Sequence, residues 1–361
     1  MKKHITPLAL AIALISSGAL ADGNVATTDQ MGDNNTATID QVSVVDSIAT
    51  VYQDGDSNGA AIIQGDSLAA MTATVETFGS NNRGAITQND SWFAEASIVQ
   101  DGDSNQGQIS QVLVSDGSSA SISQQLANDN TAYIDQQSAA LSTATIDQFN
   151  ALSNSAEIQQ DTTFGSDASI TQTNTLLDQA YIFQTGDFHQ ANIVQDGSWV
   201  AEANISQEGE LHTANITQTA ISDGSMADIS QLGFSNTASI DQNQSQQSEA
   251  IISQDGEMLE ASIMQGAGDL NVALVAQTGV ANVATIDQPG AENTADIDQS
   301  GEYNLATIEQ MGNASTASIL QTGYGQVDNI NMATIQQSGA ADMAVITQTG
   351  GAGNYSAIVQ N

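Results

Sequence analysis

The chain has 361 residues, a formal net charge of −39 at pH 7 and no cysteine. Three basic residues stand against 42 acidic ones, so no basic surface is available for nucleic acid or for an anionic membrane surface, and both partners are excluded. Without cysteine, no disulfide can stabilise the fold. The counterparts that remain are cations, basic patches and, under salt screening, other copies of the chain.

Residues 1–21 have the pattern of a secretory signal peptide. Lys2 and Lys3 precede the apolar stretch LALAIALISSGAL, and ALA at 19–21 has the pattern of a cleavage site. We therefore expect this segment to be removed and residues 22–361 to leave the cytoplasm as one continuous domain. The alternative is an uncleaved anchor, although the apolar stretch is short for a bilayer span, and no later stretch predicts membrane insertion.

From residue 26 to residue 360 one phrase recurs, Ala-x-Ile-x-Gln. Strict matches number 22, six near matches keep the glutamine, and one unit, ATVET at 73–77, has Thr77 in its place, which makes 29 units. The spacing between the last residues of successive units is 11, 12 or 13, except between Gln321 and Gln337, where it is 16. No linker or shift in composition divides this array.

The units have the period of strands. Within each unit the apolar residues lie at i and i+2, whereas a helix would place them at i, i+3 and i+4. The spacers are rich in Gly, Asn, Asp and Ser, as in QDGDSN and QTGVAN. Glycine costs about 1 kcal/mol per residue inside a helix, which argues against a coiled coil of 11-residue period. We therefore interpret the units as strands and the spacers as turns.

Strand alternation predicts how these units stack. Ala, Ile and Gln of each unit share one face, and an asparagine two residues before the alanine often joins them. Two units of opposed isoleucine faces would make one rung, and a rung becomes stable only when others stack on it. The prediction is an all-β fold, a β-solenoid of about 14 strand–turn–strand rungs. We expect it to be uncapped and able to form a cross-β polymer.

Inward amides need partners, and stacking supplies them. An identical glutamine or asparagine lies one rung above and one rung below, so these amides can form hydrogen-bonded ladders along the axis. The residues predicted for this structural ladder and its isoleucine core are Gln30, Asn35, Ile39, Gln41, Gln53, Asn58, Ile62, Gln64, Gln277, Asn282, Ile286, Gln288, Asn293, Ile297, Gln299, Asn304, Ile308 and Gln310.

The consensus Gln-x-Gly-x-x-Asn-x-Ala-x-x-x-Gln resembles the repeat of curlins, the subunits of bacterial curli amyloid fibres. Four segments fit every fixed position: QMGDNNTATIDQ (30–41), QTGVANVATIDQ (277–288), QPGAENTADIDQ (288–299) and QSGEYNLATIEQ (299–310). Isoleucine between Ala and Gln is more similar to repeats of the minor, nucleator-type curlin than to those of the major one. Three departures are the greater length, the missing Gly-rich segment after the signal and the missing basic terminal repeat.

The resemblance implies a secreted functional amyloid. Its members form fibres at the bacterial cell surface, in biofilm matrix and in adhesion, and are exported unfolded through an outer-membrane channel with accessory proteins. The implied partners are the chain itself, other curlin subunits and that secretion machinery. The departures leave open whether this is a major or a nucleator subunit and whether it uses the usual targeting segment.

Few residues carry chemistry of their own. His189 and His212 stand where Asn often stands, and we interpret them as polar substitutes for it, with a metal-binding pair as the alternative. DGDSN at 54–58 and 101–105 predicts turns; weak calcium binding is the alternative, although the later bidentate Glu of a calcium loop is missing. Trp92 and Trp199 are expected near turns, where they could pack at an edge or contact a ligand. No cofactor is expected.

Catalysis is not expected. The carboxylates recur at outward positions of every unit, whereas a glycosidase needs one pair in special surroundings. Beyond the signal segment the only basic residue other than histidine is Arg83, which leaves few groups to activate a nucleophile or stabilise an anion. The leading hypothesis is a self-assembling structural protein. The alternative is a monomeric β-solenoid, an adhesin or a protein whose surface binds ice or cations.

Overall fold

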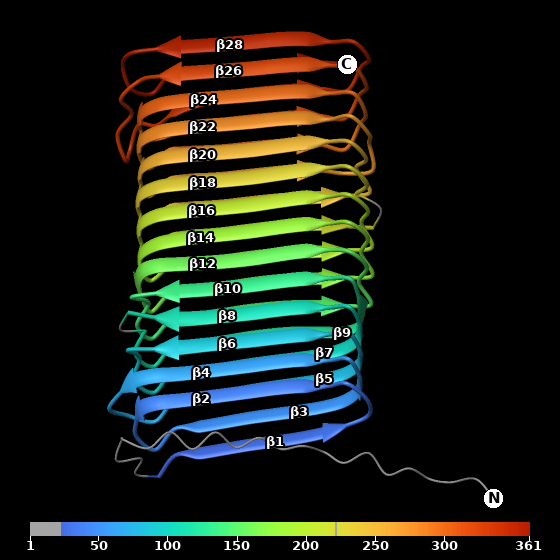
Figure 1. Cartoon of the computed structure of the whole chain (residues 1–361). Coiled ribbons are helices and arrows are strands. Elements are labelled where there is room, and N and C mark those ends of the chain that lie inside the picture. The colour runs from blue at the N-terminus through green and yellow to red at the C-terminus, as the bar shows by residue number, and fades with distance from the viewer. Residues whose placement is uncertain (1–22, 114, 221) are drawn as a thin grey trace, which may run out of the picture.

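The computed structural model describes residues 23–113, 115–220 and 222–361, and these consist of 29 strands joined by turns (Figure 1). The predicted signal peptide, residues 1–21, lies outside the described residues. Within the described part, no helix is long and apolar enough to cross a membrane.

The strands form two parallel sheets, one of 15 and one of 14 strands, and the chain passes from one sheet to the other after every strand. The odd-numbered strands are β1 (Val25–Met31), β3 (Ile48–Asp56), β5 (Thr72–Ser80), β7 (Glu95–Asp103), β9 (Ser119–Asn128), β11 (Thr143–Phe149), β13 (Asp167–Thr173), β15 (Gln190–Asp196), β17 (Thr213–Thr219), β19 (Thr237–Asn243), β21 (Glu260–Gln265), β23 (Val283–Gln288), β25 (Asn304–Gln310), β27 (Asn331–Gln337) and β29 (Tyr355–Gln360). The even-numbered strands are β2 (Thr36–Val44), β4 (Gly59–Ser67), β6 (Arg83–Asn89), β8 (Gln106–Val112), β10 (Thr131–Gln137), β12 (Ser155–Phe164), β14 (Gln179–Asp187), β16 (Glu202–Glu210), β18 (Met226–Phe234), β20 (Glu249–Glu257), β22 (Val272–Val280), β24 (Thr294–Glu302), β26 (Thr316–Thr322) and β28 (Met343–Thr349).

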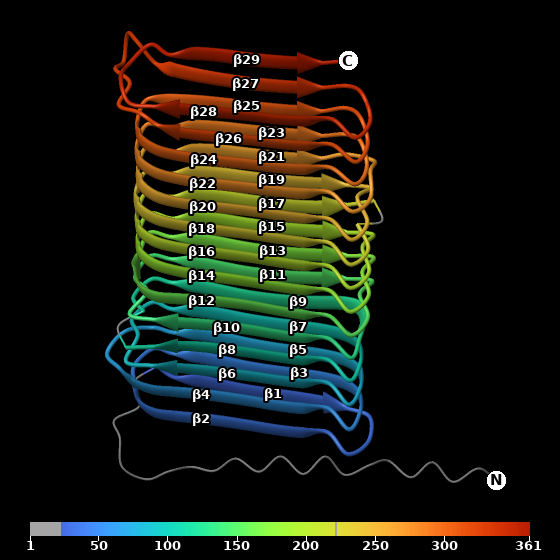
Figure 2. The same cartoon turned by 90° about the horizontal axis from the view of Figure 1, so that it is seen from above.

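The repeated phrase sets the register between neighbouring strands. In β2 and β4, Ala37 lies beside Ala60, Ile39 beside Ile62 and Gln41 beside Gln64, and the same alignment recurs through both sheets. The alanines and isoleucines of the two sheets face each other in one continuous core. Figure 2 shows odd and even strands alternating along this stack. The predicted all-β solenoid is confirmed.

The ends of the described stack have free strand edges. Among the described residues, β1, β2, β28 and β29 each have a strand neighbour on one side only. Their inward side chains are partly open as a result: Ile39 and Ile358 are half-buried, whereas the isoleucines at the same inward position of the strands between them are almost fully buried. Such an edge offers unpaired backbone N–H and C=O groups to another strand.

The two edges of the solenoid are built from different turns. The edge whose turns contain a glycine with positive φ is not the same in the N-terminal and the C-terminal part of the chain. Near the N-terminus, the glycine-containing turns run from an odd to an even strand, where the spacing between glutamines is 11, and each has a glycine with positive φ. These glycines are Gly32, Gly55, Gly79 and Gly102. Further along the chain, the glycines with positive φ at this position of the repeat lie in the turns from an even to an odd strand, on the opposite edge. They are Gly186, Gly209, Gly233, Gly256, Gly279 and Gly301. In contrast, Gly268, Gly290 and Gly312 in the odd-to-even turns have no positive φ.

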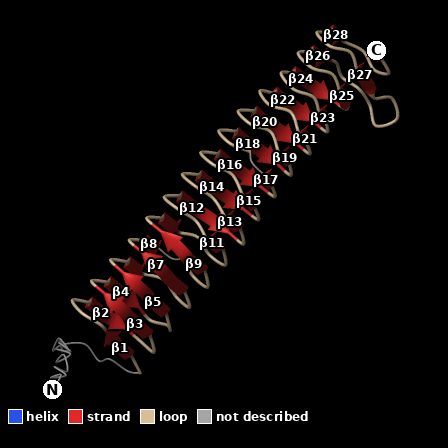
Figure 3. Ribbon diagram, turned by 90° about the vertical axis from the view of Figure 1, so that its right-hand side faces the viewer, coloured by secondary structure: helices blue, strands red, loops and turns tan. Residues whose placement is uncertain are grey.

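The change takes place between Gln124 and Gln184, where the spacing between glutamines is constant at 12. Such glycines are replaced there by Ala127 and Thr163, which align with Gly102 and Gly186 in neighbouring strands. The widest spacing, which follows Gln321, corresponds to a longer connection from β26 to β27. Figure 3 shows this connection standing out from the stack near its C-terminal end.

Candidate functional site: polar ladders and a surface hollow

The inward glutamines form two rows of hydrogen-bonded amides, one in each sheet. In every described bond within these rows, Nε2 of one glutamine donates to Oε1 of the glutamine one rung further along the chain. Examples are Gln41 to Gln64 at 2.8 Å and Gln136 to Gln160 at 2.7 Å. The even-sheet row is continuous from Gln41 to Gln348. All its amides therefore point the same way along the axis.

The same amide nitrogens also join the two sheets. Gln160 in the even sheet donates to the carbonyl oxygens of Thr143 and Ser166 at 3.2 and 3.1 Å, and both of these belong to the odd side of the rung. One glutamine thus donates both to the next glutamine along the axis and to backbone carbonyls across the core. A buried amide is tolerated only when its groups are paired in this way.

The structure places the ladder residues predicted from the sequence on the inward face. Most are almost fully buried, while Gln30, Asn35, Ile39 and Gln41 in the first described rung are half-buried. The buried ones are Gln53, Asn58, Ile62, Gln64, Gln277, Asn282, Ile286, Gln288, Asn293, Ile297, Gln299, Asn304, Ile308 and Gln310. The glutamines and isoleucines align in columns, and the asparagines divide between the two edges, where they precede even strands or odd strands.

The asparagines build a second kind of column at each edge. Oδ1 of Asn35 accepts the backbone N–H of Asn58 at 2.9 Å, and Oδ1 of Asn58 accepts that of Asn82 at 3.0 Å. Nδ2 of Asn58 donates to the carbonyl of Gly79 in the next rung at 2.9 Å. Each asparagine thus replaces a strand hydrogen bond at the point where the chain turns.

His189 and His212 occupy this asparagine column on the even-to-odd edge. Nδ1 of His189 accepts the backbone N–H of His212 at 3.3 Å, and Nδ1 of His212 accepts that of Asn236 at 3.1 Å. Each Nε2 lies 3.0–3.1 Å from the carbonyl four residues earlier, as Nδ2 of Asn236 does. The rings are stacked with centroids 5.1 Å apart.

These contacts require neutral imidazoles with the proton on Nε2, because Nδ1 must accept. Burial lowers the pKa of His212 to about 4, opposed by its hydrogen bond to the Glu208 carbonyl and helped by the neighbouring His189. Burial also lowers the pKa of His189. Both ring nitrogens of each histidine already have protein partners, so the geometry supports the role of asparagine substitutes.

Asp178 occupies the column on the opposite edge and was not singled out from the sequence. One carboxylate oxygen accepts the backbone N–H of Ala201 at 2.8 Å, and the other accepts the hydroxyl of Ser198. Burial raises its pKa to about 6, although these two hydrogen bonds oppose the rise. The signal was present, because Asp178 stands two residues before Ala180, where other units carry asparagine.

The DGDSN segments build turns. Oδ1 of Asp56 accepts the backbone N–H of Asp33 at 2.9 Å, and Oδ1 of Asp103 accepts that of Ser80 at 2.9 Å. Both contacts join neighbouring rungs. In the part of the chain that the structure describes, no group of three or more His, Cys, Asp or Glu residues has the arrangement of a metal site.

Trp92 and Trp199 lie at turns and are exposed by 45% and 57%. Trp199 aligns with Leu176, and Leu176 with Leu152, through isolated parallel bridges. The three side chains therefore follow one edge of the stack over consecutive rungs.

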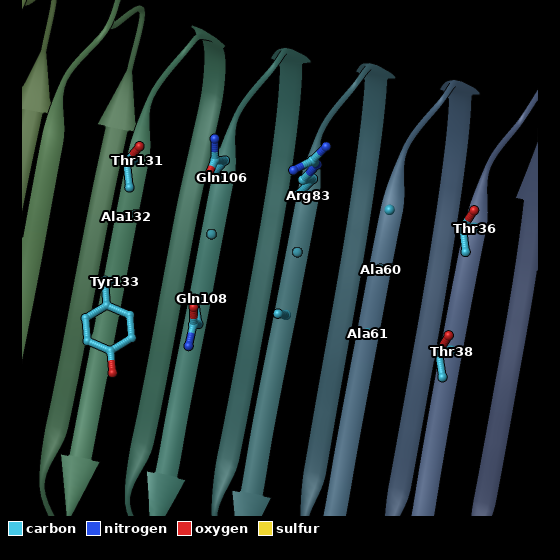
Figure 4. A pocket seen from close by; sticks show the side chains of 14 residues that line it. Thr36, Thr38, Ala60, Ala61, Arg83, Gln106, Gln108, Thr131, Ala132 and Tyr133 are labelled. Atoms are coloured by element: carbon cyan, nitrogen blue, oxygen red, sulfur yellow. The ribbon is translucent and has the colours of Figure 1, made fainter.

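A hollow of about 650 Å³ lies on the outer face of the even sheet, over β2 to β10 (Figure 4). The repeat departs locally here, because Gly84 and Gly107 take the place of the inward alanine. A Cβ on Gly84 would lie 2.5 Å from Cγ1 of Val75, so the two sheets approach more closely here than alanine permits. The outward residues Ala61 and Ala85 are small as well and leave the floor open.

The rim of this hollow is chemically unlike the rest of the surface. It carries Arg83, Gln108 and Tyr133, and no carboxylate lines it. Figure 4 shows Arg83 and Gln106 at one end of the strands and Tyr133 beside Gln108 further along. A second hollow of about 570 Å³ on the odd sheet is lined by threonine, serine, alanine, asparagine and glutamine and by Asp167, without an arginine or an aromatic ring.

Comparison with known protein families finds a match to part of the repeat array. Residues 290–323 match the family model of the curlin-associated repeat. These curlin repeats comprise β24, β25 and β26, from the region between Gln277 and Gln321 where the spacing of the glutamines does not vary. A search of curated proteins finds no match to the chain. The strands β22, β27 and β28, which lie outside the matched segment, align with its strands in the same register, Ala beside Ala and Gln beside Gln.

Proposed function

We propose that the chain is a secreted structural subunit that self-assembles into extracellular, curli-like amyloid fibres at the bacterial cell surface. The curlin repeat at 290–323 and the parallel, in-register stack support this proposal. The role is structural rather than catalytic. Residues 1–21 would act as the signal peptide and residues 22–361 as the fibre-forming domain.

The observation that carries the proposal is the repetition of identical columns. Nearly every rung presents alanine, isoleucine and glutamine at the same positions to its neighbour, so a rung from a second copy can continue each column. Each added isoleucine contributes about 1.5–3 kcal/mol by burying its side chain, and each backbone hydrogen bond adds about 1 kcal/mol net. The free edges of the outermost described strands are where such a rung would pair.

The test is assembly from the unfolded state. The chain from residue 22 onwards is diluted from denaturant into moderate salt and followed by thioflavin fluorescence and fibre diffraction. We expect a lag, then growth, with reflections at about 4.7–4.8 Å and 10 Å. A soluble β-rich monomer that persists at high concentration would contradict the proposal.

Two finer points belong to the same proposal. Isoleucine in the repeat suggests a nucleator-type subunit, with other curlin subunits as partners and an outer-membrane channel with accessory proteins for export. Preformed fibres of this chain should then shorten the lag of a major curlin subunit. An unchanged lag would assign this chain to elongation instead.

The hollow at Arg83 favours a second candidate, a monomeric solenoid that binds a ligand on its outer face. Its volume of about 650 Å³ and its mixture of apolar floor and a few polar groups are typical of small-molecule sites. Under this alternative, a glycan array would detect binding that Arg83→Ala and Tyr133→Ala abolish while the circular dichroism spectrum stays unchanged. Absence of binding by the native chain would remove this candidate.

A further inference from the structure

The glutamine row of the odd sheet is interrupted once, at Thr77. Strands β3, β5 and β7 align Gln53 with Thr77 and Thr77 with Gln100. Neighbouring strands are about 4.8 Å apart, so Gln53 and Gln100, two rungs apart, are too distant to bond each other directly. Threonine is two heavy atoms shorter than glutamine and does not bridge them.

Three polar atoms at this interruption are buried and have no partner among the atoms of the described residues. They are Nε2 of Gln53, Oγ1 of Thr77 and Oε1 of Gln100. The three side chains have no exposed surface. Buried polar groups are nearly always hydrogen-bonded, so three in one column indicate a partner that is not a protein side chain.

The ladder fixes which way each amide points. Gln30 donates to Oε1 of Gln53 at 2.6 Å, so Nε2 of Gln53 faces Thr77 as a donor. Nε2 of Gln100 donates to Oε1 of Gln124 at 2.8 Å and to the carbonyl of Arg83 at 3.1 Å, so Oε1 of Gln100 faces Thr77 as an acceptor. Turning either amide would break these bonds.

The partner must therefore accept a hydrogen bond from Gln53 and donate one to Gln100. A metal cation or an ammonium ion cannot accept, and an unprotonated anion cannot donate. A water molecule does both, and it has a further proton and lone pair for the Thr77 hydroxyl. The absence of a side chain at Gly84 leaves room for this water molecule, because a Cβ there would lie 3.6 Å from Oε1 of Gln100. One water takes about 30 Å³ and needs two to four polar partners.

We infer that Thr77 creates an internal water-binding site in which one water molecule bonds Gln53, Thr77 and Gln100 and completes the odd-sheet ladder. The water takes the place of the missing amide group, with the same direction of donation along the axis. The site lies inside the stack of a single chain, so it is independent of whether copies assemble.

The test uses transfer of magnetisation from water protons to the assigned side-chain amides of Gln53 and Gln100, in solution for a soluble chain and in the solid state for fibres. In the native chain we expect strong transfer to the amide protons on Nε2 of Gln53 and weak transfer to those of the other buried ladder glutamines. Thr77→Gln restores the repeat and should abolish it. Thr74→Gln, the same change on the outward side of β5, should leave it intact.

Weak transfer in the native chain, equal to that of Gln160, would overturn the inference, and so would persistence of the signal in Thr77→Gln. A second measurement does not depend on any variant. A high-resolution structure of the native chain should show one density peak within hydrogen-bonding distance of all three atoms. Density without that peak, or with the Gln53 amide turned toward another partner, would equally contradict the site.

Discussion

At the scale of single residues, the inward glutamine is the group on which most others depend. Gln160 accepts from Gln136 and donates to Gln184, and it also donates to two backbone carbonyls. Leucine at this position would keep the shape but leave Oε1 of Gln184 without a donor and Nε2 of Gln136 with only its longer bonds to backbone carbonyls, and each such loss costs about 1–3 kcal/mol.

We therefore expect Gln160→Leu to lower the free energy of unfolding by about 2–5 kcal/mol, measured by denaturant titration. Gln179→Leu is the matched control, because Gln179 is exposed on the next strand of the same sheet. A loss of similar size in both variants would show that the ladder is not the source of the stability.

His212 predicts a loss of stability on acidification. Its folded pKa is about 4, below the ordinary 6.5, so the unfolded chain takes up a proton first as the pH falls. Stability should drop between pH 6.5 and 4 by on the order of 3 kcal/mol for this group. His212→Asn, which restores the usual residue of the column, should flatten this part of the stability curve. An unaltered curve in the variant would contradict the prediction.

Asp178 predicts the opposite dependence. Its folded pKa of about 6 lies above the ordinary 3.8, so the folded chain takes up the proton first. Its contribution is most favourable below pH 3.8 and is lost as the pH rises through 6. Asp178→Asn should raise the melting temperature at pH 7.5 and change it little at pH 3.5. A lower melting temperature at pH 7.5 would show that the carboxylate is needed for Ser198 and Ala201.

The asparagine column also shows what could be predicted from single residues. His189 and His212 were interpreted as asparagine substitutes from their place in the unit, and their contacts follow the pattern of Asn236. Asp178 has the same place and was missed, because an acidic residue suggests an exposed turn rather than a buried partner for Ser198. The hollow at Arg83 could not be foreseen, since it is formed by residues from five strands that become neighbours only in the folded sheet.

At the scale of elements, the glycine-containing turns are the most restrictive part of the fold. Gly209 has a φ of 127°, and a Cβ there would overlap the carbonyl oxygen of Gly233 in the next rung. Gly197 also has a positive φ, of 70°, but a Cβ would meet nothing within 4 Å.

Comparing Gly209→Ala with Gly197→Ala separates strain from steric clash. Both variants carry the penalty of a left-handed conformation, about 1–2 kcal/mol, but only Gly209→Ala must move the next turn. We expect its melting temperature to fall further, corresponding to about 1–3 kcal/mol more. Equal effects would mean that neighbouring turns shift freely.

Sequence periodicity predicted the strands well and the turns only partly. The Ala-x-Ile-x-Gln phrase fixes which side of each strand faces inward, so register followed directly. Spacings of 11, 12 and 13 were visible, but a spacing alone does not say which edge a turn occupies. The change of the positive-φ glycines from one edge to the other, between Gln124 and Gln184, emerges only when odd and even strands are assigned to separate sheets.

At the scale of the whole molecule, charge should govern assembly. With a net charge of −39, copies repel each other at low salt, and carboxylates about 5 Å apart repel by roughly 0.8 kcal/mol before screening. Burial raises the pKa of several aspartates, among them Asp228, Asp241, Asp287 and Asp296, so these lose their charge early as the pH falls.

We expect the lag before fibre growth to shorten when sodium chloride is raised from 10 to 300 mM, because the Debye length falls from about 30 Å to below 10 Å. It should also shorten from pH 8 to pH 5. A lag that does not change with salt or with pH would rule out charge repulsion as the factor that slows assembly.

The uniform direction of the glutamine amides has a consequence for any stack of this kind. Cutting the stack between two rungs exposes Oε1 acceptors on one surface and Nε2 donors on the other, because each amide donates toward the later residue. The parallel strands have the same asymmetry, with no two-fold axis to make the surfaces alike. A fibre grown from such units would have two chemically different tips, and we expect one to elongate faster than the other when growth is watched on single filaments.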